Sequence, residues 1–482
     1  MGKAVLYLGY FTLYSIILLI IGKSSLHGSN TPEDYFICGR KVSLPLCVST
    51  FTGTWVSAIT ILSLTGNVYE DGISALIYSV FPWFAGGFFL AAVAGRVWQS
   101  EAITIPEYFK LRFGGSDLQL LYGIVFVFVY LLYLVPQYKG FGMIASELFE
   151  IPYPLAVLLV YLFILYTTIG GYRSVIRTDF FNLLLLTLSL LLICGTLIGK
   201  AGGLSQLFRT VSGISGRAYP GAMHPTAEGQ LLSLSNSRFG PLVSLSMFWG
   251  WGLGLAANPQ YLIRVMSADS RRNARNTVLL SLLLLSVIYV SLTLIGLSMR
   301  ALVPALTGES TTDGIFIRIM NNELYGPFSG LFFFSVIGAC ISTANSQLLL
   351  IASAVSYDIV GAAVNSPLSS RATVRFARIT VLAAGTLAML LALNPPAFTL
   401  SFGGDLWGVI GILVFPPLCA SIYSSSITLD GVRACIAVGI VVIAVAYPLN
   451  YLGYLPAHPA MFGVPLSTVA MILRSRRTGG AA

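Results

Sequence analysis

An apolar run near the N-terminus is broken by the polar stretch Ser49-Thr50-Phe51-Thr52-Gly53-Thr54-Trp55-Val56-Ser57-Ala58. A second apolar run, in the other half of the chain, is broken by Trp249-Gly250-Trp251-Gly252-Leu253-Gly254 and ends at Asn258-Pro259. A helix interrupted inside hydrocarbon leaves backbone amides and carbonyls unpaired, which costs several kcal/mol per group unless the groups line an enclosed cavity. Because paired interruptions in two halves of a chain are typical of the binding site of a secondary transporter, the pattern predicts a carrier.

The composition predicts a membrane protein that crosses the bilayer many times. Hydrophobic residues make up 56% of the 482 residues and charged residues 9%, with a mean hydropathy of +0.84. These values exclude an ordinary soluble domain. Because a span needs roughly 20 apolar residues to cross about 30 Å of hydrocarbon, we expect thirteen spans, near 5–22, 45–68, 74–98, 119–147, 153–170, 178–199, 238–265, 277–300, 328–360, 373–393, 398–425, 432–452 and 458–474. No small-residue cleavage site follows the first span, which we interpret as a retained helix and not as a signal peptide.

The distribution of the basic residues predicts the orientation in the membrane. If the N-terminus lies outside, most of the 27 Lys and Arg residues fall in cytoplasmic segments, Arg173, Arg264 and Arg378 among them. This bias satisfies the positive-inside rule and needs no acidic partner such as a nucleic acid. We therefore expect a multi-pass protein of the plasma (inner) membrane, with its N-terminus outside and its C-terminus in the cytoplasm.

The cysteines and histidines carry no sign of a metal centre or an enzyme. All six cysteines fall in expected spans or cytoplasmic segments, so no structural disulfide is expected. No cysteine pair has zinc-ligand spacing, and the three histidines are scattered. Because no nucleophile–base pair emerges either, we expect neither enzymatic activity nor an organic cofactor.

The order of the spans predicts an inverted repeat. Two sets of five spans follow each other, and each set opens with a broken span; because five is odd, the second set must lie upside down relative to the first, with a site near the midplane. The alternative is an arbitrary division of thirteen helices in which the glycines reflect the general frequency of Gly in membrane spans. We expect an N-terminal accessory helix and loop (1–44), a first repeat (45–199), an extracytoplasmic connector (200–237), an inverted second repeat (238–425), and C-terminal accessory helices with a short basic tail (426–482).

Hydroxyl groups in the ninth span are candidate ligands of a monovalent cation. Ser342, Thr343 and Ser346 lie on or near one helical face. With carbonyl oxygens freed at the break near Gly53 and Val56, they could supply about five hard oxygens, and a set without a carboxylate suits a monovalent ion. The alternative is that the hydroxyls bond to their own helix or to neighbouring helices.

Two ionisable residues are candidates for function. Asp179 begins the sixth span, where it is either a functional carboxylate or an interfacial residue favoured by the helix dipole. Lys139 lies about 12 Å inside the fourth span at 1.5 Å per residue. It either snorkels to the outer surface or faces the cavity and attracts an anionic group. The neighbouring Gln137, Gly140 and Gly142 favour the cavity.

Aromatic residues beside the breaks are candidates for contact with a small organic solute. Trp55, Trp249 and Trp251 adjoin the two breaks, and Tyr78 lies in the third span. Packing in the core or at the interface is the common alternative for each of them.

Several motifs in this order resemble the sodium:solute symporter family, over roughly residues 30–430. They are the runs Ile105-Pro106-Glu107-Tyr108-Phe109-Lys110-Leu111-Arg112-Phe113-Gly114, Gly170-Gly171-Tyr172-Arg173-Ser174-Val175-Ile176-Arg177-Thr178-Asp179, Gly252 to Arg264, and Ser342-Thr343 followed by Ser346-Gln347-Leu348-Leu349. The resemblance implies an all-α leucine-transporter-type fold with a five-plus-five inverted repeat, broken helices and Na⁺-driven alternating access.

The resemblance also implies binding residues. The family's Na⁺ site maps onto Gly53, Val56, Ala339, Ser342 and Thr343, and sodium is then the only expected metal. A second ion found in some members would use Asp179, Ser342, Asn345 and Ser346, where Asn345 departs from the family's serine. Substrate contacts transfer loosely to Trp55, Ser57, Thr60, Tyr78, Gln137, Lys139 and Trp251. An aromatic residue typical of the proline carriers is replaced by Leu255, which argues against proline itself.

The sequence therefore predicts Na⁺-coupled symport of a small organic solute by a protein that functions as a monomer. Lys139 favours a carboxylate-bearing solute such as a monocarboxylate, an amino acid or pantothenate. A sugar or sialic acid symporter, a solute-sensing receptor of the same fold and a passive channel are the alternatives. H⁺ or Li⁺ in place of Na⁺ also stays open, because Asp179 could carry a proton.

Overall fold

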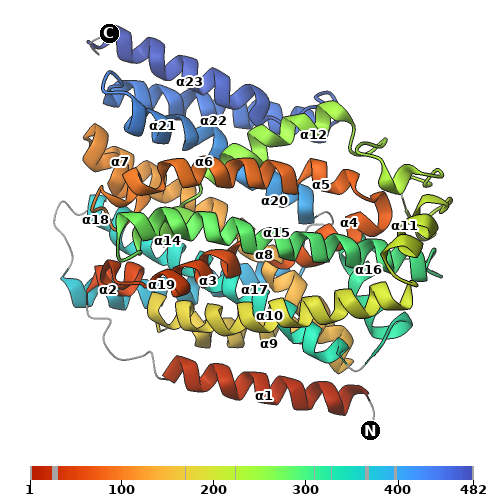
Figure 1. Ribbon diagram of the computed structural model, residues 1–482. Helices are drawn as coiled ribbons and strands as arrows, with labels where there is room; N and C mark the ends of the chain where they lie inside the picture. The colour runs from red at the N-terminus through yellow and green to blue at the C-terminus, as the bar shows by residue number, and fades with distance from the viewer. Residues whose placement is uncertain are drawn as a thin grey trace.

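The computed structural model describes residues 3–23, 31–168, 170–222, 224–308, 310–326, 328–363, 369–395 and 399–479. The described residues are helical apart from loops and two isolated β-bridges. Long helices run side by side in one bundle (Figure 1), which agrees with the all-α membrane fold expected from the sequence.

Each of the thirteen expected spans coincides with helical structure. Within the described residues, nine helices are long and apolar enough to cross a bilayer, and one bent pair makes a tenth. The remaining three expected spans coincide with a shorter apolar helix, an interrupted helix and a helix with a basic end. In chain order the thirteen are α1 (Lys3–Lys23), α3 (Leu44–Trp55) with η2 (Ile59–Ser63) and α4 (Leu64–Asp71), α5 (Ser74–Tyr78) with α6 (Val80–Trp98), α8 (Ser116–Phe149), α9 (Tyr153–Thr168), α10 (Tyr172–Lys200), α12 (Pro241–Met247) with η4 (Phe248–Gly252), α13 (Leu253–Ala256) and α14 (Pro259–Met266), α15 (Arg271–Leu302), α17 (Ser329–Ser353) with η6 (Ala354–Ile359) and α18 (Val360–Ala363), α19 (Ser370–Ala392), α20 (Thr399–Leu413) with α21 (Phe415–Tyr423), α22 (Leu429–Tyr451) and α23 (Ala460–Arg477).

The first expected break is present, whereas the second lies later in the chain than expected. The residues from Trp249 to Gly254 are helical, in η4 and α13, and the interruption comes at Ala257 and Asn258. Helix α3 ends at Trp55 because Val56 takes an extended conformation (φ −79°, ψ 109°), and the chain bends by 58° before it continues as η2 and α4. In the second half, Asn258 is extended and its side chain caps α14, which starts with Pro259. Proline has no amide hydrogen to donate and disfavours helix at the residue before it, so the helix must restart there.

Short helices occupy equivalent places in the two halves of the chain. Helix α7 (Ile105–Phe113) follows α6, and α16 (Thr312–Arg318) follows α15; each is capped by a threonine, Thr104 and Thr311. Helix α7 packs against α14 and η6, whereas α16 packs against η2, α4 and α8. The two lie at opposite ends of the bundle (Figure 1), as an inverted repeat requires.

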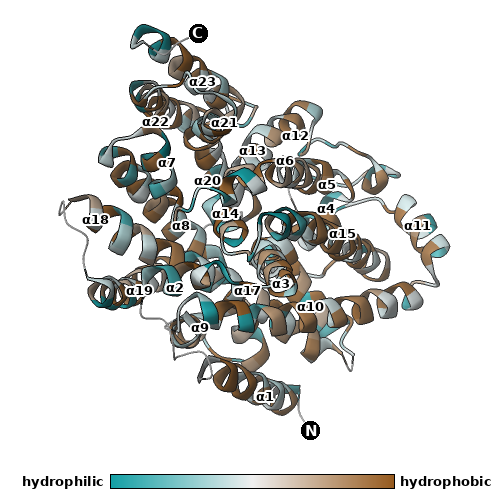
Figure 2. Ribbon diagram, turned by 60° about the vertical axis from the view of Figure 1, so that its left-hand side comes forward, coloured by the Kyte–Doolittle hydropathy of each residue, from teal (hydrophilic) through white to brown (hydrophobic). Residues whose placement is uncertain are grey.

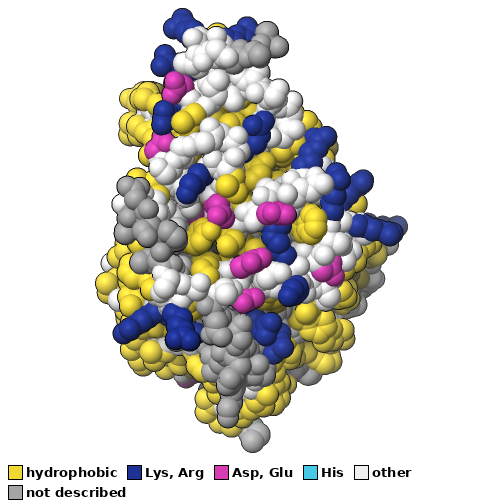
Figure 3. All heavy atoms as spheres, turned by 90° about the vertical axis from the view of Figure 1, so that its left-hand side faces the viewer, with side chains coloured by type: hydrophobic (Ala, Val, Ile, Leu, Met, Phe, Trp, Pro, Cys, Tyr) yellow, Lys and Arg dark blue, Asp and Glu magenta, His cyan; other side chains and the backbone are white. Residues whose placement is uncertain are grey.

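The bundle has an apolar outside and a fully buried central helix. Brown, hydrophobic segments dominate the outer helices, and α3, α14 and α17 lie towards the middle (Figure 2). The most apolar window of α17 with its extension is entirely buried. Lys and Arg side chains gather on the end of the bundle that Figure 3 faces, where α10, α15 and α19 begin with the exposed Arg173, Arg271 and Arg371.

Candidate ion and substrate site

The first broken span meets α17 through the residues predicted to hold Na⁺. The Thr343 hydroxyl donates to the carbonyl oxygens of Thr54 (3.3 Å) and Val56 (3.4 Å). A Cβ added at Gly53 would lie only 3.2 Å from Ser342 Oγ, so glycine allows the close approach of the two helices. Ala339 is buried one turn before Ser342 on α17. These contacts bring hydroxyl and carbonyl oxygens together at the break.

Two buried oxygens near Gly53 have no partner. Among the described residues, Ser342 Oγ and Asp179 Oδ1 have no partner in normal hydrogen-bond geometry, although the Ser342 hydroxyl lies close enough to the Asp179 carboxylate to interact with it. Asp179 Oδ2 accepts a hydrogen bond from the Thr50 hydroxyl at 2.5 Å. The Gly53 Cβ position is also 3.7 Å from Asp179 Cβ. Buried polar atoms are nearly always paired in folded proteins, so buried oxygens without partners indicate a place where a ligand binds. The set differs from the one expected from the sequence, because it includes one carboxylate. A single carboxylate together with hydroxyl and carbonyl oxygens fits one small, hard cation of low charge.

Asp179 lies deeper than an interfacial residue would. It is fully buried and stands seven residues after the start of α10. Its position next to Gly53 and Thr50 connects α10 to the first broken span. Asp179 is therefore packed against the first broken span and is not exposed at a helix start.

The other residues predicted for a second ion face different partners. Ser346 Oγ lies 2.8 Å from Thr54 Oγ1 and donates to the Ser342 carbonyl at 2.8 Å. Asn345 Oδ1 instead accepts hydrogen bonds from Thr167 (2.9 Å) and Thr168 (2.7 Å) on α9. The side-chain oxygen of Asn345 is therefore turned towards α9.

Arg264 corrects the sequence analysis, which placed it in a cytoplasmic segment. Its side chain is only 1% exposed and lies on α14, among residues of the first broken span. Its Nε donates to the Thr50 carbonyl at 3.0 Å, and its Nη2 donates to Thr54 Oγ1 and Ser346 Oγ. The apolar residues on both sides of Arg264 (Leu262, Ile263, Val265 and Met266) were a signal of burial.

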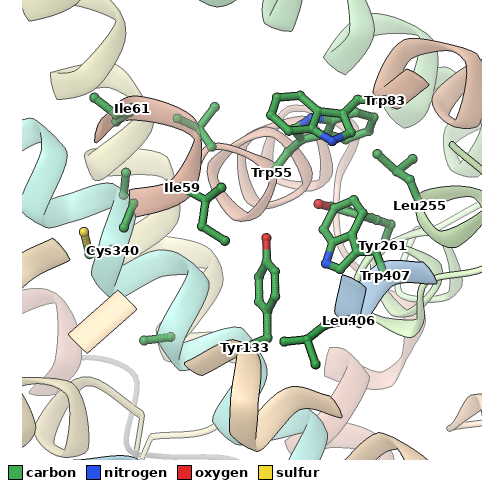
Figure 4. Packing of buried hydrophobic residues seen from close by; sticks show 14 of the residues in the cluster. Trp55, Ile59, Ile61, Trp83, Tyr133, Leu255, Tyr261, Cys340, Leu406 and Trp407 are labelled. Atoms are coloured by element: carbon green, nitrogen blue, oxygen red, sulfur yellow. The ribbon is translucent and has the colours of Figure 1, made fainter. Parts of the chain in front are cut away.

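Aromatic side chains connect the two breaks. Trp55 lies 5.0 Å from Tyr261, which lies 5.5 Å from Trp407, and Trp251 lies 5.0 Å from both Trp407 and Trp83 between ring centroids. Figure 4 shows Tyr133 of α8 standing among these side chains, between Ile59 and Trp407. The sequence pointed to Trp55 and Trp251 because they adjoin the breaks. It missed the other rings, whose positions within apolar spans look the same as ordinary core positions.

This aromatic cluster presents hydrogen-bond donors without acceptors. Among the described residues, the buried indole nitrogens of Trp55, Trp83 and Trp251 and the buried hydroxyls of Tyr261 and Tyr289 form no hydrogen bond of normal geometry, although Trp55 lies beside Tyr289. An unpaired buried donor costs free energy, and five in one region indicate a solute or water as their partner. The cluster is therefore the candidate substrate site.

Three other predicted substrate residues stabilise the first break. The Ala58 amide donates to Gln137 Oε1 at 3.1 Å, which replaces a bond lost where the helix stops. The Thr60 hydroxyl donates to the Trp55 carbonyl at 3.2 Å and lies 3.5 Å from Ser57 Oγ. These contacts hold the break open next to the aromatic cluster.

Tyr78 and Lys139 make contacts at the α16 end of the site. Tyr78 packs on Phe239, with 4.5 Å between ring centroids. Lys139 Nζ pairs with Asp313 Oδ2 of α16 at 2.5 Å, and Asp313 also accepts from the Ser63 hydroxyl at 2.6 Å. The sequence analysis named no acidic partner for Lys139, because Asp313 lies 174 residues further along the chain.

Comparisons with known proteins identify the family. A model of the sodium:solute symporter family matches residues 35–439. A sodium/proline symporter of Staphylococcus aureus is 24% identical over 445 residues, which cover 90% of this chain and 84% of that protein. The sodium/proline symporter of S. aureus strain USA300 / TCH1516 is 25% identical over 446 residues with the same coverage.

Solved structures share the fold. A Na⁺-coupled sialic acid symporter in a substrate-bound outward-open state superimposes with a TM-score of 0.78 at 20% identity, over 100% of this chain and 99% of that one. A nucleobase-cation-symport-1 family transporter in a closed conformation gives 0.58 at 12% identity, over 94% and 96%. These likenesses confirm the leucine-transporter-type fold. The chain belongs to the sodium:solute symporter family.

Proposed function

We propose that this protein couples the inward flow of Na⁺ to the uptake of a small, carboxylate-bearing organic solute. Membership of the family supports Na⁺-coupled solute transport. The observation that carries the proposal is the pair of orphaned oxygens, Ser342 Oγ and Asp179 Oδ1, beside Gly53. They lie where the first broken span meets α17, so an ion bound there would tie the two elements together.

The Na⁺ site would set the conformation that the solute meets. Oxygens of Gly53, Val56, Ala339, Ser342 and Thr343 would hold the ion, with Asp179 facing the same place. An ion that binds both elements stabilises the conformation in which its ligands from the first broken span and from α17 lie close together. Ion binding therefore shifts the equilibrium between the outward and inward states. Each inward Na⁺ contributes about 2.3 kcal/mol per 100 mV of membrane potential, in addition to its concentration gradient.

The proposal that the solute bears a carboxylate rests on the hydrogen-bond donors of the aromatic cluster. Lys139 has an acidic partner in Asp313, so its charge is already compensated. The aromatic cluster offers indole N–H and phenol O–H groups that lack acceptors, and a carboxylate is a strong acceptor for several such donors. The sodium/proline symporters among the relatives carry a solute with this group. A monocarboxylate, an amino acid or pantothenate all satisfy the requirement.

The contacts at the two ends favour a state closed on one side. At the α16 end, Arg238 bonds Glu70 (3.1 Å) and Asp71 (3.0 Å), and Thr312 donates to Glu70 at 3.0 Å. At the α7 end, a cavity of about 600 Å³ is lined by residues that include Glu107, Lys110, Gln119 and Tyr357. If the basic end faces the cytoplasm, the contacts of Arg238 lie on the outer side, and the cavity lies on the inner side, where its lining includes none of the candidate ion or substrate residues.

We further propose the topology expected from the sequence. The termini of the described chain lie at opposite ends of the bundle (Figure 1), and the basic end holds the C-terminal side of α23. This supports an outside N-terminus and a cytoplasmic C-terminus in the plasma membrane. The matching places of α7 and α16 support repeats over 45–199 and 238–425.

Transport by purified protein tests the proposal. The protein in proteoliposomes should accumulate a radiolabelled carboxylate solute from a panel of monocarboxylates, amino acids and pantothenate when Na⁺ is higher outside. Accumulation should disappear when K⁺ replaces Na⁺ or when a sodium ionophore collapses the gradient. Uptake that never exceeds equilibrium, with or without the gradient, would contradict coupling and indicate a passive pathway.

A further inference from the structure

Arg264 is a buried cation whose hydrogen bonds all go to neutral oxygens. The four bonds that the described residues show go to the carbonyls of Thr50 and Gln260 and to the hydroxyls of Thr54 and Ser346. An arginine that is only 1% exposed normally needs a carboxylate, because a buried charge costs several kcal/mol when it is uncompensated. The positive charge of this guanidinium group must therefore be compensated by another group inside the site.

Asp179 is the carboxylate that balances Arg264, and Thr50 stands between them. The Thr50 carbonyl accepts from Arg264 Nε, while its hydroxyl donates to Asp179 Oδ2. One residue, Thr50, therefore links the guanidinium group to the carboxylate. Arg264 thus compensates Asp179 without a hydrogen bond to Oδ1, which has no hydrogen-bond partner among the described residues.

The guanidinium also takes up oxygens that a second cation would need. Of the residues expected for a second ion, Ser346 accepts from Arg264 and lies against Thr54. Asn345 directs its side-chain oxygen to Thr167 and Thr168. Asp179 and Ser342 each keep an oxygen without a hydrogen-bond partner among the described residues, and both lie at Gly53, where the first ion is proposed to bind. A second ion would therefore find Ser346 already bonded to a positive charge.

We propose that Arg264 acts as a fixed cation in place of a second coupling ion, so that each transport cycle carries one Na⁺. This inference rests on the proposed function and defines its stoichiometry. With a monocarboxylate or pantothenate as the solute, Asp179, Arg264, one Na⁺ and the solute carboxylate sum to zero net charge. A second Na⁺ would leave a buried positive charge in a low-dielectric site, which is unfavourable.

Equilibrium binding of radiolabelled Na⁺ to purified protein tests the inference without a transported solute. We expect one Na⁺ per chain and a Hill coefficient of one. The Arg264→Gln variant should bind Na⁺ about tenfold more tightly, because the repulsion of a nearby buried cation is removed. Arg264→Lys keeps the charge and should stay near the wild-type affinity. A purely structural arginine predicts the opposite for Arg264→Gln, namely weaker binding.

Arg300 provides the matched control. It is also fully buried, but lies on α15 against Tyr69, Gly216 and Thr226, so Arg300→Gln should leave Na⁺ affinity unchanged. Two Na⁺ per wild-type chain would overturn the inference, as would unchanged or weaker binding by folded Arg264→Gln. Should that variant fail to fold, the wild-type ion count still decides. Absence of any Na⁺ binding would instead overturn the proposed function.

Discussion

At the scale of single residues, the site depends on how closely α3 approaches α17 and α10. Gly53 faces Ser342 Oγ and the Asp179 side chain, and a glycine at such a position allows backbone and ligand to come together. The sequence indicated Gly53, Val56, Ser342 and Thr343 because a break and a hydroxyl-rich face are visible in one dimension. It could not place Arg264 or Asp313, whose partners are far away in the chain.

Gly53→Ala should weaken Na⁺ binding. The added methyl group would lie 3.2 Å from Ser342 Oγ, so the hydroxyl must move away from the ion position. We expect the Na⁺ concentration for half-maximal uptake to rise about tenfold, equivalent to the loss of roughly 1.4 kcal/mol. Gly195→Ala is the control, since a Cβ there meets nothing within 4 Å and Na⁺ dependence should not change. Equal effects of the two substitutions would contradict the close approach at Gly53.

Asp179→Asn should keep the fold and lose much of the Na⁺ affinity. The amide oxygen can still accept from the Thr50 hydroxyl, but the negative charge that faces the ion is gone. We expect at least about a tenfold rise in the half-saturating Na⁺ concentration, because one charge near the ion is lost. The melting temperature of the purified variant should stay within a few degrees of wild type. Unaltered Na⁺ dependence would show that Asp179 does not face the ion.

At the scale of elements, α16 packs against one end of the first broken span and covers it. Lys139 of α8, Ser63 of η2 and Asp313 of α16 meet in a buried ion pair with a supporting hydroxyl. The lengths of the apolar runs predicted the long spans. Glycine and proline residues predicted that two of the spans are interrupted. Short helices such as α7 and α16 could not be predicted, because nine or seven residues of mixed polarity between spans carry little periodicity.

Asp313→Asn should destabilise the protein because it leaves the Lys139 charge buried without its carboxylate. Breaking one side of a buried pair typically costs roughly 3–5 kcal/mol, so we expect a clear fall in the melting temperature. The double variant Lys139→Gln, Asp313→Asn should recover most of the loss, since both charges are removed. A double variant as unstable as the single one would contradict a direct pair.

The single variant Lys139→Gln tests whether Lys139 stabilises the contact with α16 or binds the substrate. If Lys139 stabilises the contact with α16, the variant changes stability and transport rate. Its substrate affinity, measured by solute binding in saturating Na⁺, then stays close to wild type. A large loss of affinity, confined to carboxylate-bearing solutes, would instead assign the ammonium group to the substrate.

At the scale of the whole molecule, the fold follows from a pattern that one sequence already contains. All thirteen expected spans coincide with helices, and the family inferred from the motifs is confirmed. Only part of the aromatic cluster could be predicted from the sequence. Trp83 and Trp407 lie within apolar spans, where a tryptophan is indistinguishable from an ordinary core residue until the packing of the two halves is known. The identity of the solute depends on that packing, and so lies beyond what span patterns can predict.

Na⁺-dependent accumulation by the Ser342→Ala, Thr343→Ala double variant tests the central claim most directly. The cage of α17 hydroxyls and break carbonyls predicts that the half-saturating Na⁺ concentration rises by well over tenfold, or that accumulation is lost. Ser335→Ala, Ser353→Ala is the matched control, because those buried α17 hydroxyls bond only to carbonyls of their own helix, at Phe332 and Leu350; it should behave as wild type. Full accumulation by the first variant with an unchanged half-saturating Na⁺ concentration would contradict the account.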